Sequence, residues 1–126
     1  MKALVIDDSK FQRLAIQRAL GHAGYEVATA GDGEEGLRAA RQGRPDIIVL
    51  DMMLPKISGI DVLRILRREQ GTSSVPVIVL TGLSDRNRDK LMEEGASGFL
   101  EKSEALSNGD CGSLIGVIGQ LMQARK

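Results

Sequence analysis

Aromatic side chains are scarce in this sequence, which has two phenylalanines, one tyrosine and no tryptophan. Proteins that bind single-stranded nucleic acids commonly stack aromatic side chains on the bases, so the shortage argues against that mode of binding. Overall electrostatic attraction to a polyanion is not expected either, because seventeen basic and seventeen acidic residues cancel. The composition therefore gives no reason to expect a nucleic acid or a membrane surface as a partner.

Cysteine and long apolar runs are also lacking. Cys111 is the single cysteine, so an internal disulfide is excluded and a cysteine-based zinc site has no ligand set. No apolar run approaches the roughly 20 residues that cross a bilayer. The first apolar run is followed at once by Asp7 and Asp8, which makes it too short and too acidic for a secretory signal. We expect a cytoplasmic protein.

Short β-type runs alternate with helical patterns along the whole chain. The 126 residues suit one domain with one core, and we expect a single domain over 1–126 with no output domain. Five successive β-then-α units predict a parallel sheet with helices on both faces. The expected strands are 3–6, 25–30, 47–50, 77–80 and 98–100. The expected helices are 10–23, 34–42, 58–69, 85–94 and 113–125.

The strand patterns also predict the order of the strands. The runs at 3–6, 47–50 and 77–80 are continuously apolar, as strands buried on both faces should be. The run at 25–30 alternates and the run at 98–100 is very short, which is typical of edge strands. These patterns predict an α/β fold with a doubly wound five-stranded parallel sheet of order 2-1-3-4-5, the flavodoxin-like arrangement.

Three carboxylates follow strands that this order makes neighbours. Asp7 and Asp8 follow the first strand and Asp51 ends the third, at the point where strand order reverses and ligands bind in such sheets. Aspartate is also a preferred helix N-cap, so Asp7 and Asp8 alone are equally well explained as caps of the first helix. Convergence of all three favours a cation between them, and an oxygen-only ligand set suits Mg²⁺.

Thr81 and Lys102 follow the fourth and fifth strands, so a hydroxyl and an ammonium reach the same crevice. A carboxylate can act as a nucleophile and become an acyl phosphate. Phosphoryl transfer then needs groups that offset charge on the phosphoryl oxygens. Asp51 with Thr81, Lys102 and a metal ion supplies the parts of such a site.

Taken in order, these motifs resemble the CheY-like receiver domains of two-component signalling. They are Asp7-Asp8, the stretch from Asp51 to Pro55 with the later Gly59, Thr81-Gly82, and the stretch from Phe99 to Lys102. The resemblance implies that Asp51 is the phosphoacceptor and that Asp8, Asp51 and the backbone carbonyl of Met53 bind Mg²⁺ directly, with Asp7 acting largely through water. It implies that Thr81 and Lys102 bind the phosphoryl group, and that Thr81 with Phe99 forms the switch.

Two features of the sequence concern the backbone after Lys102 and the hydrolysis of the phosphoryl group. Receivers usually have proline after the lysine, but here Ser103 follows, so we expect a trans peptide bond and a rerouted segment over 103–111. By the resemblance, Met53 and Leu83 flank the approach of hydrolytic water, and neither orients water strongly. We therefore expect slow self-dephosphorylation.

Phe11 lies at the margin of the apolar stripe of the first helix and Leu14 lies beyond it. Leu14 should therefore be exposed beside the crevice, and we assign both residues to partner docking. The donor implied by the resemblance is a histidine kinase or a histidine phosphotransfer protein.

The sequence thus predicts a stand-alone, Mg²⁺-dependent receiver that switches contacts with an unidentified downstream protein and is not an enzyme in the ordinary sense. A Mg²⁺-dependent phosphohydrolase using an aspartyl phosphate is one alternative, but it would place Asp-x-Asp after the first strand. An FMN-binding module would need a hydroxyl- and glycine-rich loop there. A phosphorylation-independent interaction module would need none of these site residues.

Overall fold

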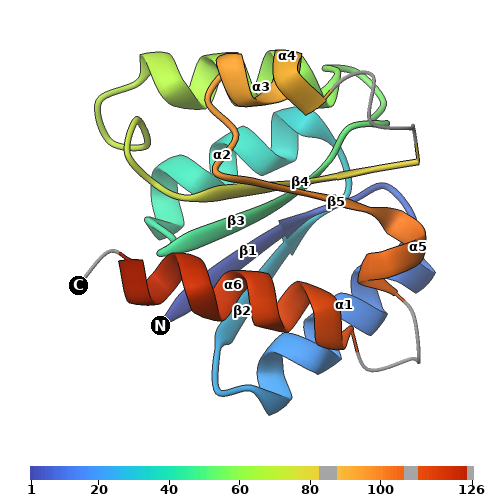
Figure 1. The fold of residues 1–126 in the computed structure, drawn as a ribbon. Coiled ribbons are helices and arrows are strands. Elements are labelled where there is room, and N and C mark those ends of the chain that lie inside the picture. Colours follow the sequence, from blue (N-terminus) through green and yellow to red (C-terminus); the bar gives the residue numbers. More distant parts are fainter. Residues whose placement is uncertain (83–87, 107–110, 125–126) are drawn as a thin grey trace.

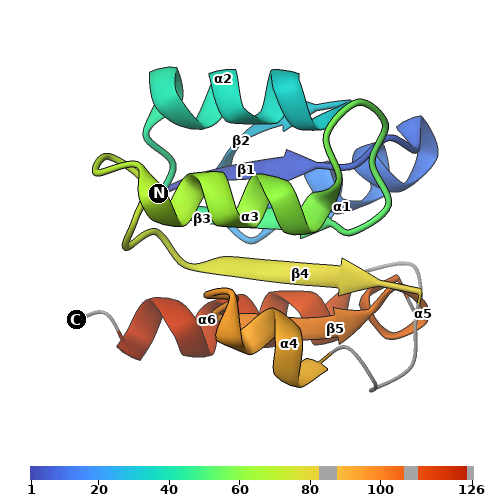
Figure 2. The same cartoon turned by 90° about the horizontal axis from the view of Figure 1, so that it is seen from above.

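The computed structural model describes residues 1–82, 88–106 and 111–124, and its centre is a five-stranded parallel sheet (Figures 1 and 2). The strand order is β2-β1-β3-β4-β5, as the burial pattern predicts. The strands are β1 (Lys2–Ile6), β2 (Glu26–Ala30), β3 (Ile47–Asp51), β4 (Val77–Thr81) and β5 (Gly98–Glu101). The helices are α1 (Lys10–His22), α2 (Gly33–Gly43), α3 (Gly59–Arg68), α4 (Arg88–Glu93), α5 (Lys102–Ala105) and α6 (Gly112–Ala124).

Burial along the strands explains which of them lie at the edges. Every residue of β3 and β4 is buried, and so is β1 after Lys2. In β2 exposed residues alternate with half-buried ones up to Ala30, because one side of this edge strand meets solvent. The continuous and the alternating apolar patterns of the sequence therefore identify the central strands and the β2 edge correctly.

Helices cover both faces of the sheet (Figure 1). α2, α3 and α4 lie on one face, over a core that includes Ile6, Leu50 and Val79. α1 and α6 lie on the other, over a core that includes Val5, Val49 and Leu80. Neighbouring residues of each central strand thus enter opposite cores, as the two-residue period of a strand requires.

Polar side chains fix where the helices begin. The Asp32 carboxylate accepts the Glu35 backbone N–H at 2.8 Å at the start of α2. Ser58 Oγ accepts the Asp61 N–H at 3.4 Å at the start of α3 and donates to the Asp61 carboxylate at 2.9 Å. Both side chains act as N-caps, because they satisfy N–H groups that lack a partner within the helix.

Arg67 of α3 fastens the start of β5 to the rest of this layer. It donates to the carbonyl oxygens of Gly95, at 2.9 Å, and Val75, at 2.6 Å, and also to those of Thr72 and Ser73. Burial lowers the pKa of its guanidinium from the ordinary value. In the sequence nothing distinguishes Arg67 from Arg64 and Arg68 on the same helix, so the clamp is a finding of the structure.

The observed secondary structure differs most from the sequence-based prediction in the segment after β5. No cis peptide bond occurs among the described residues, so the bond between Lys102 and Ser103 is trans, as predicted. A short helix, α5, occupies the first part of the segment expected to be a loop. Ala23, the last residue of the helix expected at 10–23, is exposed and forms the C-cap of α1. Of the expected helix at 85–94, the structure describes Arg88–Glu93 as helical.

No helix in the described part of the chain is long and apolar enough to span a bilayer.

Candidate functional site

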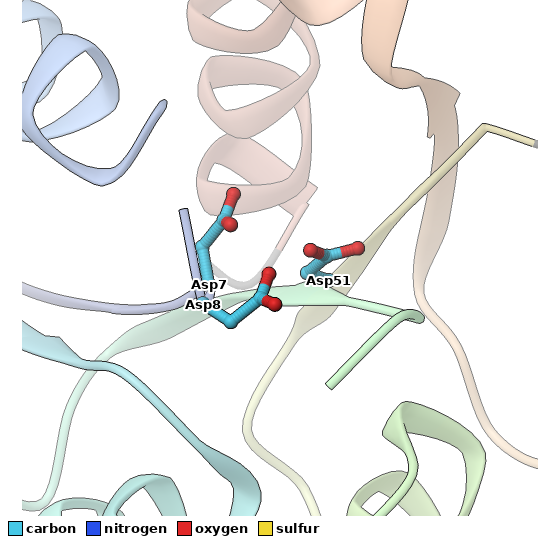
Figure 3. Close-up of side chains that lie close together, drawn as sticks. All are labelled: Asp7, Asp8 and Asp51. Atoms are coloured by element: carbon cyan, nitrogen blue, oxygen red, sulfur yellow. The ribbon is translucent and has the colours of Figure 1, made fainter. Parts of the chain in front are cut away.

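Three carboxylates gather at the carboxyl end of the sheet, where β1 and β3 lie side by side (Figure 3). Asp7 and Asp8 follow β1, and Asp51 is the last residue of β3. One oxygen from each of the three lies within 4.8 Å of the others. Asp7 and Asp51 are buried while Asp8 is exposed, so the cluster is open to solvent on the Asp8 side.

Asp51 has a donor on each of its carboxylate oxygens. Its Oδ1 accepts the Met53 backbone N–H at 3.1 Å. Its Oδ2 accepts from Lys102 Nζ at 2.8 Å, an ion pair in which Asp51 is fully buried and the lysine side chain is 23% exposed. Lys102, from the far edge of the sheet, is thus brought onto Asp51, as the strand order predicts.

Asp7 has one oxygen satisfied and one without a partner. Its Oδ1 accepts the Ser9 N–H at 2.9 Å. Its Oδ2 is buried and has no hydrogen-bond partner among the described residues. Burial, reinforced by the nearby charge of Asp51, raises the pKa of Asp7 to about 6, against the lowering effect of the Ser9 N–H and of Lys102. An ionised Asp7 is therefore costly here unless a cation accompanies it.

The cap of α1 is Ser9, whose Oγ accepts the Gln12 N–H at 3.3 Å. Asp7 and Asp8 are thus not the N-cap of this helix, which removes the alternative explanation of the acidic pair. A buried carboxylate oxygen without a donor, next to two more carboxylates, is the environment that a divalent cation satisfies. The residues present fit Mg²⁺.

Arg13 is a site residue that sequence reasoning missed. Its Nη1 donates to the backbone carbonyl of Asp7 at 2.8 Å and so fixes the turn between β1 and α1. Nothing in the local pattern distinguishes Arg13 from other basic residues on α1, so only the structure identifies it.

The loop after β3 is held close to Asp51 by two tight contacts. A Cβ on Gly59 would lie 2.5 Å from the Asp51 carbonyl oxygen, and a Cβ on Gly33 would lie 2.7 Å from the Ile57 carbonyl oxygen. Lys56, whose φ of 68° is in the left-handed region, places its ammonium 3.5 Å from the Asp32 carboxylate. These contacts fix the loop that carries Met53 over the acceptor.

The two expected switch residues lie on β4 and β5. Thr81 is buried at the carboxyl end of β4. Phe99 pairs in register with Val79, two residues before Thr81, and packs half-buried against the core beneath α2, α3 and α4. Since alternate residues of a strand share a face, Thr81 and Phe99 lie on the same side of the sheet.

Three of the four residues expected to tune hydrolysis or docking are exposed in the structure. Met53 is 66% exposed, and Leu83 falls outside the described residues. Phe11 is 82% exposed, and Leu14 is 42% exposed, as predicted. A groove of about 880 Å³ runs along α1, and we call it the α1 groove. It is lined by Phe11, Leu14, Ala15, Arg18, Ala19, His22, Leu106 and Cys111.

The chain belongs to the response regulator receiver domain family, whose model matches residues 3–108. It is 42% identical over 103 residues to the alkaline phosphatase synthesis transcriptional regulatory protein PhoP of Bacillus subtilis strain 168. That match covers 80% of this chain and 42% of PhoP, so the chain spans about two fifths of the length of this curated relative.

Solved receiver domains share the whole fold. The receiver domain of the Francisella response regulator 1452 has a TM-score of 0.88 and 31% identity, covering 99% of this chain and 98% of that one. The receiver domain of the sensor histidine kinase PA1611 from Pseudomonas aeruginosa PAO1 has a TM-score of 0.80 and 26% identity, with 94% of each chain covered. The PA1611 structure has a magnesium ion coordinated in its active site cleft.

Membership of this family makes the chain a signalling module of two-component systems rather than a metabolic enzyme. Receiver domains interact with histidine kinases and generally bind Mg²⁺ through acidic residues of the site. Here the acidic residues in the corresponding cluster are Asp7, Asp8 and Asp51.

Proposed function

We propose that the chain is a phosphorylation-controlled switch in which Asp51 accepts a phosphoryl group from a histidine kinase or a histidine phosphotransfer protein. One observation carries this proposal. Asp51 ends β3 fully buried, with the Lys102 ammonium 2.8 Å from one oxygen and the carboxylates of Asp7 and Asp8 beside it. A buried carboxylate that faces both an ammonium and a candidate cation site is placed as a nucleophile towards a phosphoryl group.

In the transfer step, an Asp51 oxygen forms a bond to phosphorus while the bond from phosphorus to the donor's histidine nitrogen breaks. The electron pair of the broken bond stays on that nitrogen, and the donor leaves as imidazole. The product is an acyl phosphate. Lys102 offsets charge on the phosphoryl oxygens and the Thr81 hydroxyl donates to one of them, which is the main work that a protein does in phosphoryl transfer.

Mg²⁺ would be held by Asp7, Asp8 and Asp51 together with the backbone carbonyl of Met53. When bound, the ion supplies positive charge that offsets the crowded carboxylates and the incoming phosphoryl oxygens. The partnerless Oδ2 of Asp7 supports this assignment, and so does the magnesium ion of the PA1611 receiver domain.

Phosphorylation would act on Thr81 and Phe99. A hydrogen bond from Thr81 to the phosphoryl group draws the end of β4 towards Asp51. Phe99 lies on the same side of the sheet and is half-buried, and we propose that it moves with the end of β4. The phosphoryl group thereby shifts the equilibrium between two arrangements of β4 and β5. A partner that binds only one of these arrangements responds to phosphorylation.

The donor would dock on α1. Phe11 and Leu14 expose apolar surface on this helix, beside the α1 groove and close to the carboxyl end of the sheet. We propose that the signal leaves through contacts with a downstream protein, in keeping with the balanced charge of the chain. PhoP bears the name of a transcriptional regulator, so a mobility-shift assay with DNA belongs among the tests of this output.

Acetyl phosphate tests the proposal without a cognate kinase. With Mg²⁺ the protein should gain the mass of one phosphoryl group, and the label should be lost in base. EDTA or Asp51→Asn should prevent the gain, whereas Asp89→Asn, an exposed aspartate on α4, should not. Uptake by Asp51→Asn equal to that of the unchanged protein would contradict the assignment.

A further inference from the structure

The residue that contacts the acceptor carboxylate also begins a helix that leads to the α1 groove. Lys102 Nζ lies 2.8 Å from Asp51 Oδ2, and Lys102 is the first residue of α5. The helix is closed by a hydrogen bond of 3.0 Å from the Leu106 N–H to the Lys102 carbonyl. Leu106 in turn lines the α1 groove. One helical turn therefore separates the contact to Asp51 from a wall of the groove.

This turn is packed so that a displacement at one end reaches the other. Ala105 is fully buried, and Leu106 packs against the same core cluster, which also includes Leu114 of α6 and Cys111. α5 contacts β4, β5 and α6. Close-packed elements have few ways to deform locally, so they move as bodies. Cys111, which directly precedes α6, also lines the groove and is 1% exposed.

We propose that α5 couples the phosphorylation state of Asp51 to the shape of the α1 groove. The inference rests on Asp51 being the acceptor. Forming the acyl phosphate removes the carboxylate charge that Lys102 faces at 2.8 Å and inserts a bulky dianionic group at that place. Lys102 then follows the phosphoryl oxygens, α5 shifts away from Asp51, and the Leu106 wall opens.

The coupling has a consequence for the donor. Coupling free energies are reciprocal, so a protein that binds the α1 groove in one state shifts phosphorylation by the same factor. A donor that prefers the unphosphorylated groove would leave once transfer is complete. The competing possibility is that the lysine stem absorbs the change alone, which would leave the groove unaltered.

Cys111 provides a reporter, because it is the single cysteine of the chain and it lines the groove. Its rate of alkylation by N-ethylmaleimide, followed by intact mass, measures access to the groove wall. Without metal, Lys102→Ala should raise this rate about fivefold or more, the lower end of typical couplings between sites. Lys56→Ala is the matched control, since Lys56 also pairs with carboxylates near this edge of the sheet, but these are Asp32 and Glu34 rather than Asp51.

The second arm uses the unchanged protein with Mg²⁺ and beryllofluoride, a mimic of the phosphoryl group. The alkylation rate should rise by a similar factor, and the rise should be absent in Asp51→Asn. Rates measured at several low urea concentrations exclude global unfolding as the route of modification. With the mimic bound, an unchanged or lowered rate in either arm would overturn the coupling.

Thermal unfolding separates this inference from the proposed function. If Mg²⁺ with beryllofluoride raises the melting temperature but leaves Cys111 alkylation unchanged, the acceptor site stands and the coupling through α5 is wrong. If beryllofluoride gives no stabilisation, the proposed function of Asp51 fails. The Lys102→Ala arm then still shows whether the contact between Lys102 and Asp51 sets the shape of the α1 groove, because it needs neither the metal nor the mimic.

Discussion

Replacing Asp7 by asparagine should stabilise the metal-free protein. Burial raises the pKa of Asp7 from 3.8 to about 6, so the folded state holds its proton more tightly than the unfolded chain does. Each pKa unit corresponds to about 1.4 kcal/mol, which makes the cost of ionising Asp7 in the folded state about 3 kcal/mol. Asparagine removes that cost and keeps an oxygen that can accept the Ser9 N–H, now at 2.9 Å from Asp7 Oδ1.

The sign of the pH dependence follows from the raised pKa. Stability that depends on protonated Asp7 is fully present below pH 3.8, declines as the pH rises towards about 6, and is lost above it. The variant should therefore be more stable than the unchanged protein by about 1–3 kcal/mol at pH 8, with the advantage shrinking as the pH falls towards about 4.5. Urea unfolding in EDTA at a series of pH values measures this difference.

Mg²⁺ should reverse the ranking. A ligand present at about a thousand times its Kd stabilises the folded state by about 4.1 kcal/mol, more than the metal-free advantage of Asp7→Asn, and the variant should lose most of that gain. Asp8→Asn is the control, because Asp8 belongs to the same cluster but is exposed. It should also weaken the response to Mg²⁺ but change the metal-free stability little. If Asp7→Asn were no more stable than the unchanged protein at pH 8 in EDTA, the reasoning about its buried oxygen would be refuted.

Three other changes test separate parts of the account. Leu14→Ala should slow transfer from a histidine-containing donor protein while leaving acetyl phosphate labelling intact, and equal losses in both assays would show that Leu14 is not a docking residue. Met53→Asn should speed loss of the phosphoryl group, by less than the factor of about 10² that a positioned general base supplies, and an unchanged decay rate would mean that water access is controlled elsewhere. Arg67→Met should lower the free energy of unfolding by about 2–4 kcal/mol because several carbonyl oxygens lose their donor. The exposed Arg68→Met should cost under about 0.5 kcal/mol, and equal effects of the two would contradict the clamp.

The central part of the fold could be predicted because the patterns are strong and local. Burial on both faces requires continuous apolar runs, and such runs identify β1, β3 and β4 as central strands. Ser58 and Asp32 precede apolar helical periods and form the caps that such residues prefer. Once the strand order is known, the ends of β1 and β3 must meet, and this alone brings Asp7, Asp8 and Asp51 together.

What could not be predicted depends on tertiary contacts. α5 has four residues and lies in a segment rich in small polar residues, so it has no periodicity that a sequence pattern could reveal. It forms where Ala105 can be buried and Lys102 can reach Asp51. The partnerless oxygen of Asp7 and the clamp of Arg67 likewise depend on where backbone carbonyls and donors end up in space. Ser9 is different, since a serine directly before a helical period is a signal that sequence reasoning could have used.

Locating the phosphoryl group on the chain shows directly whether Asp51 is the phosphoacceptor. Borohydride reduces an acyl phosphate to an alcohol and so converts a phosphorylated aspartate into homoserine, which peptide mass spectrometry places at one position. After treatment with acetyl phosphate and Mg²⁺, we expect homoserine at position 51 alone. Homoserine at position 7 or 8 instead, or a base-stable phosphoryl group on a serine, threonine or histidine, would contradict it.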